Sequence, residues 1–222
     1  MIELLCKALL AYLLGSIIGS LLVRRVTGGV DIRTLGSGNA GATNALRTQG
    51  KAVAIWVLII DVAKGWVATG RLAPWAMPGI PPPDPDIAAW LAPLCGIAVM
   101  LGHVYPVWYG FRGGKGVATL LGAVLGISAW LLIPMILAWL IAGILFGYVG
   151  FASIVAAVAL AVSLWNRNAG TPLVTFGVVA ALLIIFTHRS NIARMLAGTE
   201  SRARRLWLLG TRREQASGEP GS

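Results

Sequence analysis

Long apolar blocks dominate the chain, and its polar residues collect in short segments between them. Ile2 to Val23 and Ala52 to Gly70 are two such blocks. An α-helix needs roughly 20 residues to cross about 30 Å of hydrocarbon, so each block is long enough to span a membrane once. The blocks are too unbroken for the stripes of a soluble core, and the 222 residues are 57% hydrophobic and only 12% charged. The sequence therefore predicts an integral membrane protein.

The remaining apolar blocks predict further crossings. Ile87 to Leu101 is the third candidate span. Gly116 to Thr187 then begins and ends beside basic segments, so its crossings must be even in number, and four spans of about 18 residues fit its length better than two. The expected breaks are Ser128 to Pro134 and Gly147 to Gly150, with the last span at Leu173 to Thr187. This pattern predicts about seven crossings, and a version with five crossings and re-entrant segments keeps the same sidedness.

The distribution of charge predicts the orientation. The net charge is +10, but the basic residues fall at the ends of apolar blocks, which argues against a nucleic-acid-binding protein. The segment "PPPDPD" is acidic, and the loop at Trp165 to Gly170 holds one arginine. The positive-inside rule places the basic loops and the C-terminal tail in the cytoplasm and the N-terminus outside. The basic residues that carry this argument are Arg24, Arg25, Arg33, Arg47, Lys51, Arg112, Lys115, Arg189, Arg194, Arg202, Arg204, Arg205, Arg212 and Arg213.

These observations predict the fold class: an all-α integral membrane protein, a polytopic bundle with its N-terminus outside and its C-terminus cytoplasmic. Residues 1–200 form one membrane domain, which carries polar islands at 36–50, 102–119 and 188–200 on its cytoplasmic face. Residues 201–222 form a basic cytoplasmic tail. Cys6 and Cys95 are too few and too far from other ligands for a metal cluster, so no metal site is expected.

The first island, "GSGNAGATNALRTQG", reads at its start as G-x-G-x-x-G. Its flanks are membrane spans rather than a βαβ unit, which argues against a dinucleotide site. Its glycines permit positive φ and close approach, so backbone N–H groups can form an anion nest, and Arg47 adds a planar fork suited to phosphate. We expect the segment from about Ala42 to open the helix of the second span. A flexible polar loop is the alternative.

The second island is "GHVYPVWYGFRGGKGVAT". Tyr109 stands where a Walker A motif needs its first glycine, and Gly116 follows the lysine, so this is not a P-loop of that class. Glycines around Lys115 nevertheless expose the backbone at the start of a span, as an anion site requires. Alternatively, Lys115 only marks the cytoplasmic boundary of the membrane.

The third island is "HRSNIARMLAGTE", in which His188, Asn191 and Arg194 follow one another at intervals of three. On a helix the first two share a face and the third lies nearly alongside. His103 and His188 each stand where an apolar block meets an island, which is consistent with a polar anchor or with a role toward a proton or a phosphate.

Asp61 and Lys64 lie inside the second predicted span, three residues apart. They must be shielded from lipid. A packing pair and a functional pair are both consistent with this spacing, and the packing role is slightly favoured.

Together the three islands resemble the motifs of the bacterial acyl-phosphate-dependent glycerol-3-phosphate acyltransferases, the PlsY family. The first motif, G-S-G-N-x-G-x-T-N-x-x-R-x-x-G, is intact in this chain. The second has Trp108 where Phe is frequent and Arg112 where Lys is usual, and the third has Met195 in place of a usual Leu. The resemblance runs over nearly the whole chain. The H-x4-D pair of the soluble-donor acyltransferases is absent, because Trp108 and Ala193 occupy its acidic position.

The resemblance implies an enzyme that moves a fatty acyl group from acyl phosphate to the 1-hydroxyl of sn-glycerol 3-phosphate. The products are lysophosphatidic acid and phosphate, in phospholipid synthesis at the bacterial inner membrane. It implies no cofactor, no metal, no acyl-CoA and no acyl carrier protein. The implied partners are the two substrates and the lipid bilayer, with no nucleic acid and no obligate protein partner.

The resemblance also assigns residues, motif position by motif position. It gives catalytic roles to Ser37, Arg47, Lys115, His188 and Asn191, substrate-phosphate binding to Gly36, Gly38, Asn39, Gly41, Thr43, Asn44, Gly113 and Gly114, and supporting roles to His103, Arg112, Arg194 and Glu200. Asp61 and Lys64 lie outside the motifs, and their place inside a predicted span makes them further candidates for a supporting role.

Three routes for the reaction follow from these residues. An acyl phosphate is already activated, so direct transfer needs only two held phosphates and one aligned hydroxyl. The hydroxyl proton goes either to His188 or His103 as general base, or to a phosphate oxygen of the donor, which the resemblance favours. Ser37 as a covalent nucleophile is disfavoured, because no orienting base is adjacent in the sequence.

A transporter of a phosphorylated solute is the rival function. It predicts a site near the bilayer midplane, whereas the polar islands of this chain lie at one membrane boundary.

Overall fold

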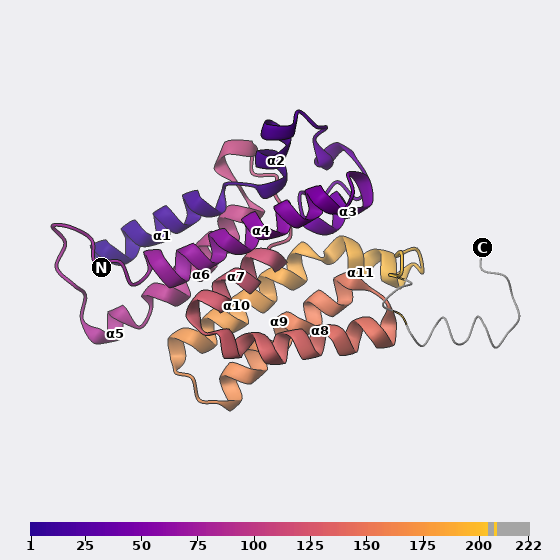
Figure 1. Ribbon diagram of the computed structural model, residues 1–222. Helices are drawn as coiled ribbons and strands as arrows, with labels where there is room; N and C mark the ends of the chain where they lie inside the picture. Colours follow the sequence, from indigo (N-terminus) through magenta and orange to yellow (C-terminus); the bar gives the residue numbers. More distant parts are fainter. Residues whose placement is uncertain (204–206, 208–222) are drawn as a thin grey trace, which may run out of the picture.

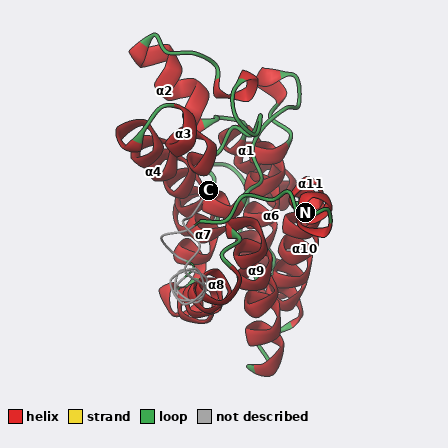
Figure 2. Ribbon diagram, turned by 90° about the vertical axis from the view of Figure 1, so that its right-hand side faces the viewer, coloured by secondary structure: helices red, strands yellow, loops and turns green. Residues whose placement is uncertain are grey.

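The computed structural model describes residues 1–203 and 207, and every regular element among them is helical (Figures 1 and 2). The α-helices are α1 (Ile2–Gly15), α2 (Gly19–Thr27), α3 (Ala42–Thr48), α4 (Lys51–Val67), α5 (Pro85–Ala88), α6 (Leu91–Val104), α7 (Val117–Ile127), α8 (Leu132–Phe146), α9 (Val149–Asn166), α10 (Thr171–Thr187) and α11 (Arg189–Leu196). Short 3-10 turns are η1 (Ile32–Thr34), η3 (Val107–Tyr109) and η4 (Ala129–Leu131), and η2 (Ala68–Leu72) is a π-helical turn. The predicted all-α class is confirmed for the described residues.

Among the described residues, four helical runs are long and apolar enough to cross a membrane. Two further pairs, α1 with α2 and α10 with α11, pass the same test if each bent pair is one span, which gives up to six. The four continuous runs are Lys51–Leu72, Pro85–Tyr109, Ala129–Phe146 and Val149–Asn166. Their exposed apolar side chains, such as Trp56 and Ile141, suit contact with lipid. The protein is therefore an integral membrane protein with several apolar helices.

The helix boundaries after the second island follow the predicted breaks. Helix α7 ends where Ser128 adopts an extended conformation, and α8 ends at Gly147, whose φ of 77° is left-handed. The loop before α10 ends at Gly170, with Pro172 in the first turn of the helix. These breaks are local signals, which is why the sequence alone locates them.

The first predicted span is wrong as one continuous helix. The chain breaks between α1 and α2, and the two helices meet at a bend of 47°. The freed backbone groups at the break are satisfied from α4: the ammonium of Lys64 donates to the carbonyl oxygens of Gly15 (3.0 Å) and Ile17 (2.7 Å), and Asp61 accepts the N–H of Gly19 (3.3 Å). A cation at the end of α1 and an anion at the start of α2 also match the helix dipoles.

Two buried lysines connect α1 with the segment formed by α4 and the residues that follow it. Lys7 of α1 donates to the carbonyl oxygen of Ala73, just beyond η2, at 2.6 Å, while Lys64 of α4 caps the end of α1. Each lysine has an acidic partner on its own helix: Glu3 lies 2.6 Å from Lys7, and Asp61 lies 2.9 Å from Lys64. Charged groups are tolerated inside a membrane only when paired in this way. The prediction that Asp61 and Lys64 are shielded from lipid is confirmed by their burial.

Glycines allow the helices to approach closely. Helix α4 packs along α7, and α1 packs along α6. A methyl group at Gly122 would collide with the carbonyl oxygen of Val62, and one at Gly102 would collide with that of Tyr12. Small residues at helix contacts are typical of membrane proteins, where packing rather than water exclusion drives association.

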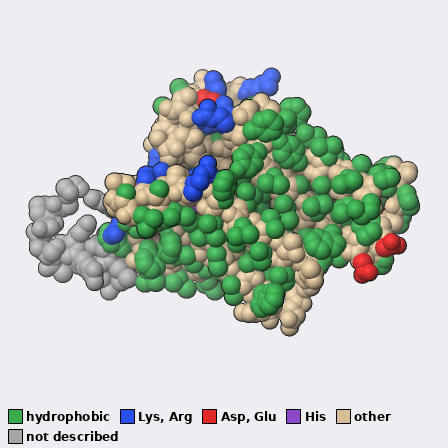
Figure 3. All heavy atoms as spheres, turned by 180° about the vertical axis from the view of Figure 1, so that it is seen from behind, with side chains coloured by type: hydrophobic (Ala, Val, Ile, Leu, Met, Phe, Trp, Pro, Cys, Tyr) green, Lys and Arg blue, Asp and Glu red, His purple; other side chains and the backbone are tan. Residues whose placement is uncertain are grey.

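The bundle has two unlike ends. Figure 1 shows α3 and α11 at one end, and α5 with the N-terminus at the other. Basic side chains gather toward the end of α3 and α11, while the middle of the surface is mostly hydrophobic (Figure 3). The three polar islands meet at the end of α3 and α11.

The predicted basic tail at 201–222 falls almost entirely outside the described residues. Arg202 is described and stacks on the ring of Tyr148, with its guanidinium carbon 5.0 Å from the ring centre.

Candidate active site

One cavity of about 240 Å³ brings the three islands together. Polar residues from each island and from α4, α6 and α9 face it, and apolar residues from α4, α7, α8 and α9 complete its wall. The polar lining residues are Ser37, Asn39, Thr43, Asn44, Arg47, Asp61, His103, Lys115, Ser153, His188, Asn191, Arg194 and Glu200.

The first island forms a compact loop that Asn44 holds from inside. The amide nitrogen of Asn44 donates to the carbonyl oxygens of Ile32 (2.9 Å) and Leu35 (3.0 Å), and its oxygen accepts the N–H of Ser37 (3.0 Å). Both amide hydrogens of this buried side chain are therefore used within the loop. Asn44 therefore shapes the loop, and it also lines the cavity, so its predicted contact with phosphate stays a prediction.

Two expectations for this island need correction. The segment from Ala42 forms its own short helix, α3, which ends at Thr48, because Gly50 takes a φ of 90° before α4 begins. Gly36 and Gly38 have the expected positive φ, 57° and 69°, but Gly41 does not and caps α3 with extended backbone instead. Gly36 and Gly38 shape the turn and do not line the cavity, whereas Gly41 does.

In the second island, the turn that precedes Lys115 packs against His103 at the end of α6. The N–H of Gly113 donates to the carbonyl oxygen of Val104, and that of Gly114 to the carbonyl oxygen of His103, both at 3.1 Å. A side chain at Gly114 would overlap the imidazole of His103. Gly113 and Gly114 are therefore packing positions outside the cavity lining, whereas Lys115 and Gly116 face the cavity. The side chain of Arg112 is exposed and lies outside the lining as well.

In the third island, Glu200 connects the cavity residues. Its two carboxylate oxygens accept from the amide of Asn191 (2.7 Å) and from Nε of Arg194 (2.5 Å). Asn191 in turn accepts a hydrogen bond from the ammonium of Lys115, which links the second island to the third. The predicted common face of His188, Asn191 and Arg194 is confirmed, because all three line the cavity.

His188 has a defined tautomer. Its Nδ1 lies 2.8 Å from the carbonyl oxygen of Ile184. A carbonyl can only accept, so Nδ1 carries the proton of the neutral ring and Nε2 is the acceptor. The imidazole is buried at the junction of α10 and α11. This geometry gives the cavity a neutral hydrogen-bond acceptor beside its cations.

The cavity is strongly cationic at its polar end. Burial and the Arg194 guanidinium lower the pKa of Lys115 to about 8, with a further lowering by Arg47, while the Glu200 carboxylate opposes the shift. Cations placed this close repel one another, and a bound anion relieves the repulsion. The arrangement suits a ligand that carries phosphate.

Asp61, Lys64 and His103 form the floor beneath this end. Nδ1 of His103 lies 2.8 Å from the ammonium of Lys64 and 3.4 Å from Asp61. Asp61 and His103 reach the cavity lining, and Lys64 lies behind them. The packing role favoured for the Asp61–Lys64 pair agrees with the helix break that it caps.

Sequence reasoning missed two groups of residues. Asp31 and Arg33 join the first island to the second through backbone carbonyls 76 and 79 residues away from Arg33, and nothing in the sequence marks such partners. The apolar wall was also missed, because Leu58, Leu121 and Trp139 look like ordinary membrane-span residues. Their membership of the cavity depends on helix packing alone.

The chain is similar to known acyltransferases over most of its length. The family model described as glycerol-3-phosphate acyltransferase matches residues 5–198. A protein of that name from Mesorhizobium japonicum is 41% identical over 191 residues, covering 86% of this chain and 91% of the relative. Another from Laribacter hongkongensis is 41% identical over 199 residues, covering 89% and 95% of the two chains.

Two solved structures share the fold. A crystal structure of PlsY (YgiH), an integral membrane glycerol 3-phosphate acyltransferase, in its glycerol 3-phosphate form superposes with a TM-score of 0.79 at 36% identity, covering 90% of this chain and 94% of that one. The lysophosphatidic acid form gives a TM-score of 0.77 at 35% identity, with the same coverage. With the three motifs, these likenesses show that the chain belongs to the PlsY family of integral membrane glycerol-3-phosphate acyltransferases.

Proposed function

We propose that the protein transfers a fatty acyl group from acyl phosphate to the 1-hydroxyl of sn-glycerol 3-phosphate, giving lysophosphatidic acid and phosphate. One observation carries the proposal: Arg47, Lys115 and Arg194, from three separate segments, border one cavity whose other wall is apolar. A cavity of this kind suits a ligand with an anionic head and a hydrocarbon tail. The relatives solved in glycerol 3-phosphate and lysophosphatidic acid forms support the acceptor and the product.

The binding roles follow the cavity lining. Ser37, Asn39 and Thr43 offer hydrogen bonds to phosphate, and Arg47 and Lys115 neutralise its charge. His188 and Asn191 orient glycerol 3-phosphate, with Arg194 held beside them by Glu200. Gly41 and Asn44 also line the cavity, and they contribute to the phosphate site as well as to the shape of the first island. The remaining motif residues shape the loops. That group consists of Gly36, Gly38, Gly113 and Gly114, with support from His103, Arg112, Asp61 and Lys64.

The proposed reaction is a direct transfer. The 1-hydroxyl oxygen attacks the carbonyl carbon of the mixed anhydride, the bond between that carbon and the phosphate oxygen breaks, and phosphate leaves with the electron pair. The donor is already activated, so alignment and charge stabilisation lower the barrier without an acyl-enzyme intermediate or a metal. Acyl label recovered covalently on Ser37 would overturn the direct route.

The proton of the attacking hydroxyl passes to a phosphate oxygen of the donor in this proposal. His188 is the competing acceptor, because its Nε2 is the acceptor atom of the neutral ring. A general base contributes about 10² to 10⁴-fold to a rate, whereas an orienting hydrogen bond contributes less. We therefore expect His188→Gln to lower kcat by less than about 100-fold, by the same factor at every pH. A loss that disappears as the pH is raised would identify His188 as the base.

The proposed orientation places the cavity in the cytoplasm at the bacterial inner membrane. It includes seven crossings, with the N-terminus outside, the C-terminus inside and residues 1–200 as one domain. Helix α7 has 11 residues, about 16 Å at 1.5 Å per residue, so its crossing relies on neighbouring helices to cover a short span. The gathering of basic side chains at the end of the bundle that carries the islands supports this orientation.

Phosphate release from palmitoyl phosphate by the purified protein in detergent tests the function. We expect release that depends on added glycerol 3-phosphate and is unaffected by EDTA, and we expect no lysophosphatidic acid when palmitoyl-CoA replaces palmitoyl phosphate as the donor. Formation of lysophosphatidic acid from palmitoyl-CoA alone would move the donor to another class. Uptake of glycerol 3-phosphate into vesicles without turnover would replace the enzyme by a transporter.

A further inference from the structure

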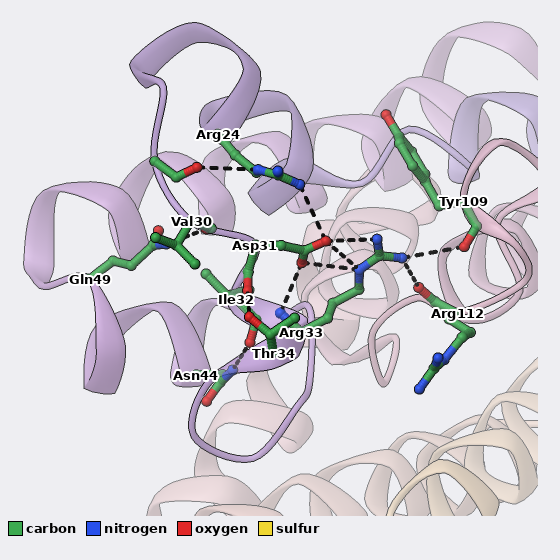
Figure 4. A network of polar contacts seen from close by, with 11 residues as sticks. Arg24, Val30, Asp31, Ile32, Arg33, Thr34, Asn44, Gln49, Tyr109 and Arg112 are labelled. Carbon is green, nitrogen blue, oxygen red and sulfur yellow. Dashed lines mark hydrogen bonds and ion pairs between the residues drawn. The ribbon is translucent and has the colours of Figure 1, made fainter.

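The two loops that carry the main cations of the cavity are far apart in the sequence, and one ion pair joins them. Arg33 lies in η1, beside the first island, and its Nη1 donates to the carbonyl oxygens of Tyr109 (3.3 Å) and Arg112 (3.1 Å) of the second island. Asp31 accepts from Nε and Nη2 of the same guanidinium, at 3.1 Å and 2.8 Å. Figure 4 shows the guanidinium between the Asp31 carboxylate and these two carbonyl groups.

Arg33 is fixed relative to Arg47 through Asn44. The amide nitrogen of Asn44 donates to the carbonyl oxygens of Ile32, the first residue of η1, and of Leu35, which follows η1. Asn44 belongs to α3, which also carries Arg47 in its last turn. Any displacement of η1 therefore displaces α3 as well. The position of the Arg33 guanidinium is thus coupled to the position of the first island.

Arg112 is fixed relative to Lys115 through a short tight turn. Only Gly113 and Gly114 separate them, and both donate backbone hydrogen bonds to the end of α6. A side chain at Gly114 would overlap the ring of His103, so this turn has no room to slide. A hydrogen bond to the carbonyl oxygen of Arg112 therefore also restrains the position of Lys115.

We propose that the Asp31–Arg33 pair is a positioning unit that staples the first loop to the second and so sets the spacing between Arg47 and Lys115. Neither residue lines the cavity, so neither is catalytic. The inference rests on the proposed function for its substrates: two phosphates must lie side by side for one hydroxyl to reach one carbonyl carbon.

The chemistry of arginine fits this task. A guanidinium offers five donors in a rigid plane and can bind a carboxylate and two carbonyl groups together, whereas a lysine ammonium is a point charge on a flexible stem. Asp31 fixes the plane, and the Arg33 guanidinium in turn lowers the pKa of the Asp31 carboxyl. The carboxylate therefore stays ionised at neutral pH and holds the arginine in place.

Kinetics of Arg33→Gln, Arg33→Lys and Asp31→Asn test the staple, with Arg25→Ala as the control. Arg25 is an exposed arginine on the neighbouring helix α2, so its removal changes net charge without touching either loop contact. We expect kcat/KM to fall about 10- to 100-fold in Arg33→Gln, mainly through kcat, with a smaller fall in Arg33→Lys and Asp31→Asn. Arg25→Ala retains the parent values, and all variants elute as monodisperse protein with unchanged Tm.

A distance measurement tests the staple without turnover. Spin labels at Leu46→Cys on α3 and Trp108→Cys on the second island, both exposed positions, report the separation of the two loops in a background with Cys6 and Cys95 replaced. We expect one narrow distance distribution in the parent and in Arg25→Ala, and a broadened one in Arg33→Gln. An unchanged distribution, or unchanged kcat/KM in Arg33→Gln, overturns the proposal. A parent enzyme without turnover overturns the proposed function instead and leaves the distance result to decide the staple.

Discussion

At the scale of single residues, the cavity depends on charges that burial has brought close together. Lys115 contacts Asn191, faces Arg194 and Arg47, and lies near the Glu200 carboxylate. A lysine in such surroundings loses its proton more easily than one in water. The charge that would hold a phosphate is therefore sensitive to pH near neutrality.

We expect kcat/KM of the free enzyme to fall as the pH rises through about 8. The pKa of Lys115 is lowered to about 8, so its ammonium is present below that pH and lost above it. In Lys115→Arg the guanidinium stays charged, so the alkaline fall moves to higher pH even if the maximal rate is lower. The pH profile of kcat/KM for glycerol 3-phosphate measures both. An identical alkaline limb in the two proteins would assign it to another group.

The residues of the cavity were more predictable than their bonds. Ser37, Arg47, Lys115, His188 and Asn191 all face it, because short motifs place polar groups beside spans. Asn44 and Glu200 show the limit: their side chains organise other residues, and this is visible only from partners such as Ile32 and Asn191. A hydrogen bond between residues distant in sequence leaves no local periodicity to read.

At the scale of elements, buried charged side chains connect helices that the sequence pattern predicts as separate spans. Asp61 and Lys64 lie one turn apart on α4 and together satisfy the break between α1 and α2. The break was not predicted, because Gly15, Ser16 and Gly19 lie within one block that has the length of a single span, and the side chains that satisfy the freed backbone groups lie on another helix. The breaks near Ser128 and Gly147 were predicted, because the long segment that holds them requires turns between its spans.

Removing one member of this pair should be worse than removing both. We expect Lys64→Met to destabilise the protein by about 3–5 kcal/mol, because the Asp61 carboxylate then stays buried without its cation. The double variant Asp61→Asn, Lys64→Met should recover part of that loss. Unfolding of detergent-solubilised protein measures the difference, and equal losses in the single and double variants would contradict the coupling.

Close helix contact gives a second prediction at this scale. A methyl group at Gly122 would meet the backbone of Val62, so Gly122→Ala should force α7 from α4 and cost about 1–3 kcal/mol. Gly143→Ala in α8 is the matched control, since no atom of the described residues lies within 4 Å of the added methyl group there. The control should be neutral or gain about 0.5–1 kcal/mol from helix propensity. Melting temperatures of the two variants compare them, and an equal change in both would rule out the packing explanation.

At the scale of the whole molecule, the unlike ends of the bundle define a direction. The polar islands lie at the end of α3 and α11, and the acidic loop before α6 lies at the other end. The bundle and its helix types could be predicted from long apolar blocks, whereas the number of crossings could not, because α7 and the bent pairs fall near the length that a span requires.

Cysteine labelling tests the direction. In a background without Cys6 and Cys95, we expect Asp84→Cys, Trp130→Cys and Arg167→Cys to react with an impermeant maleimide from outside intact cells, because all three positions are exposed and the proposed orientation places them on the outer side. Leu46→Cys and Thr199→Cys should react only after the membrane is opened. Labelling of position 130 from the inside would favour five crossings, and labelling of position 46 from outside would reverse the orientation.

The long-range hydrogen bonds of Lys7 and Lys64 also constrain how the chain inserts into the membrane. Lys7 finds its acceptor at Ala73, 66 residues later, and Lys64 must reach back 49 residues to Gly15. Before Ala73 is synthesised, Lys7 has only Glu3 of its own helix as a partner, and a charged pair in hydrocarbon still carries a desolvation cost. We therefore expect α1 to enter the bilayer together with α4, as one antiparallel hairpin. A ribosome stalled before Ala73 should accordingly leave α1 extractable from the membrane by alkali.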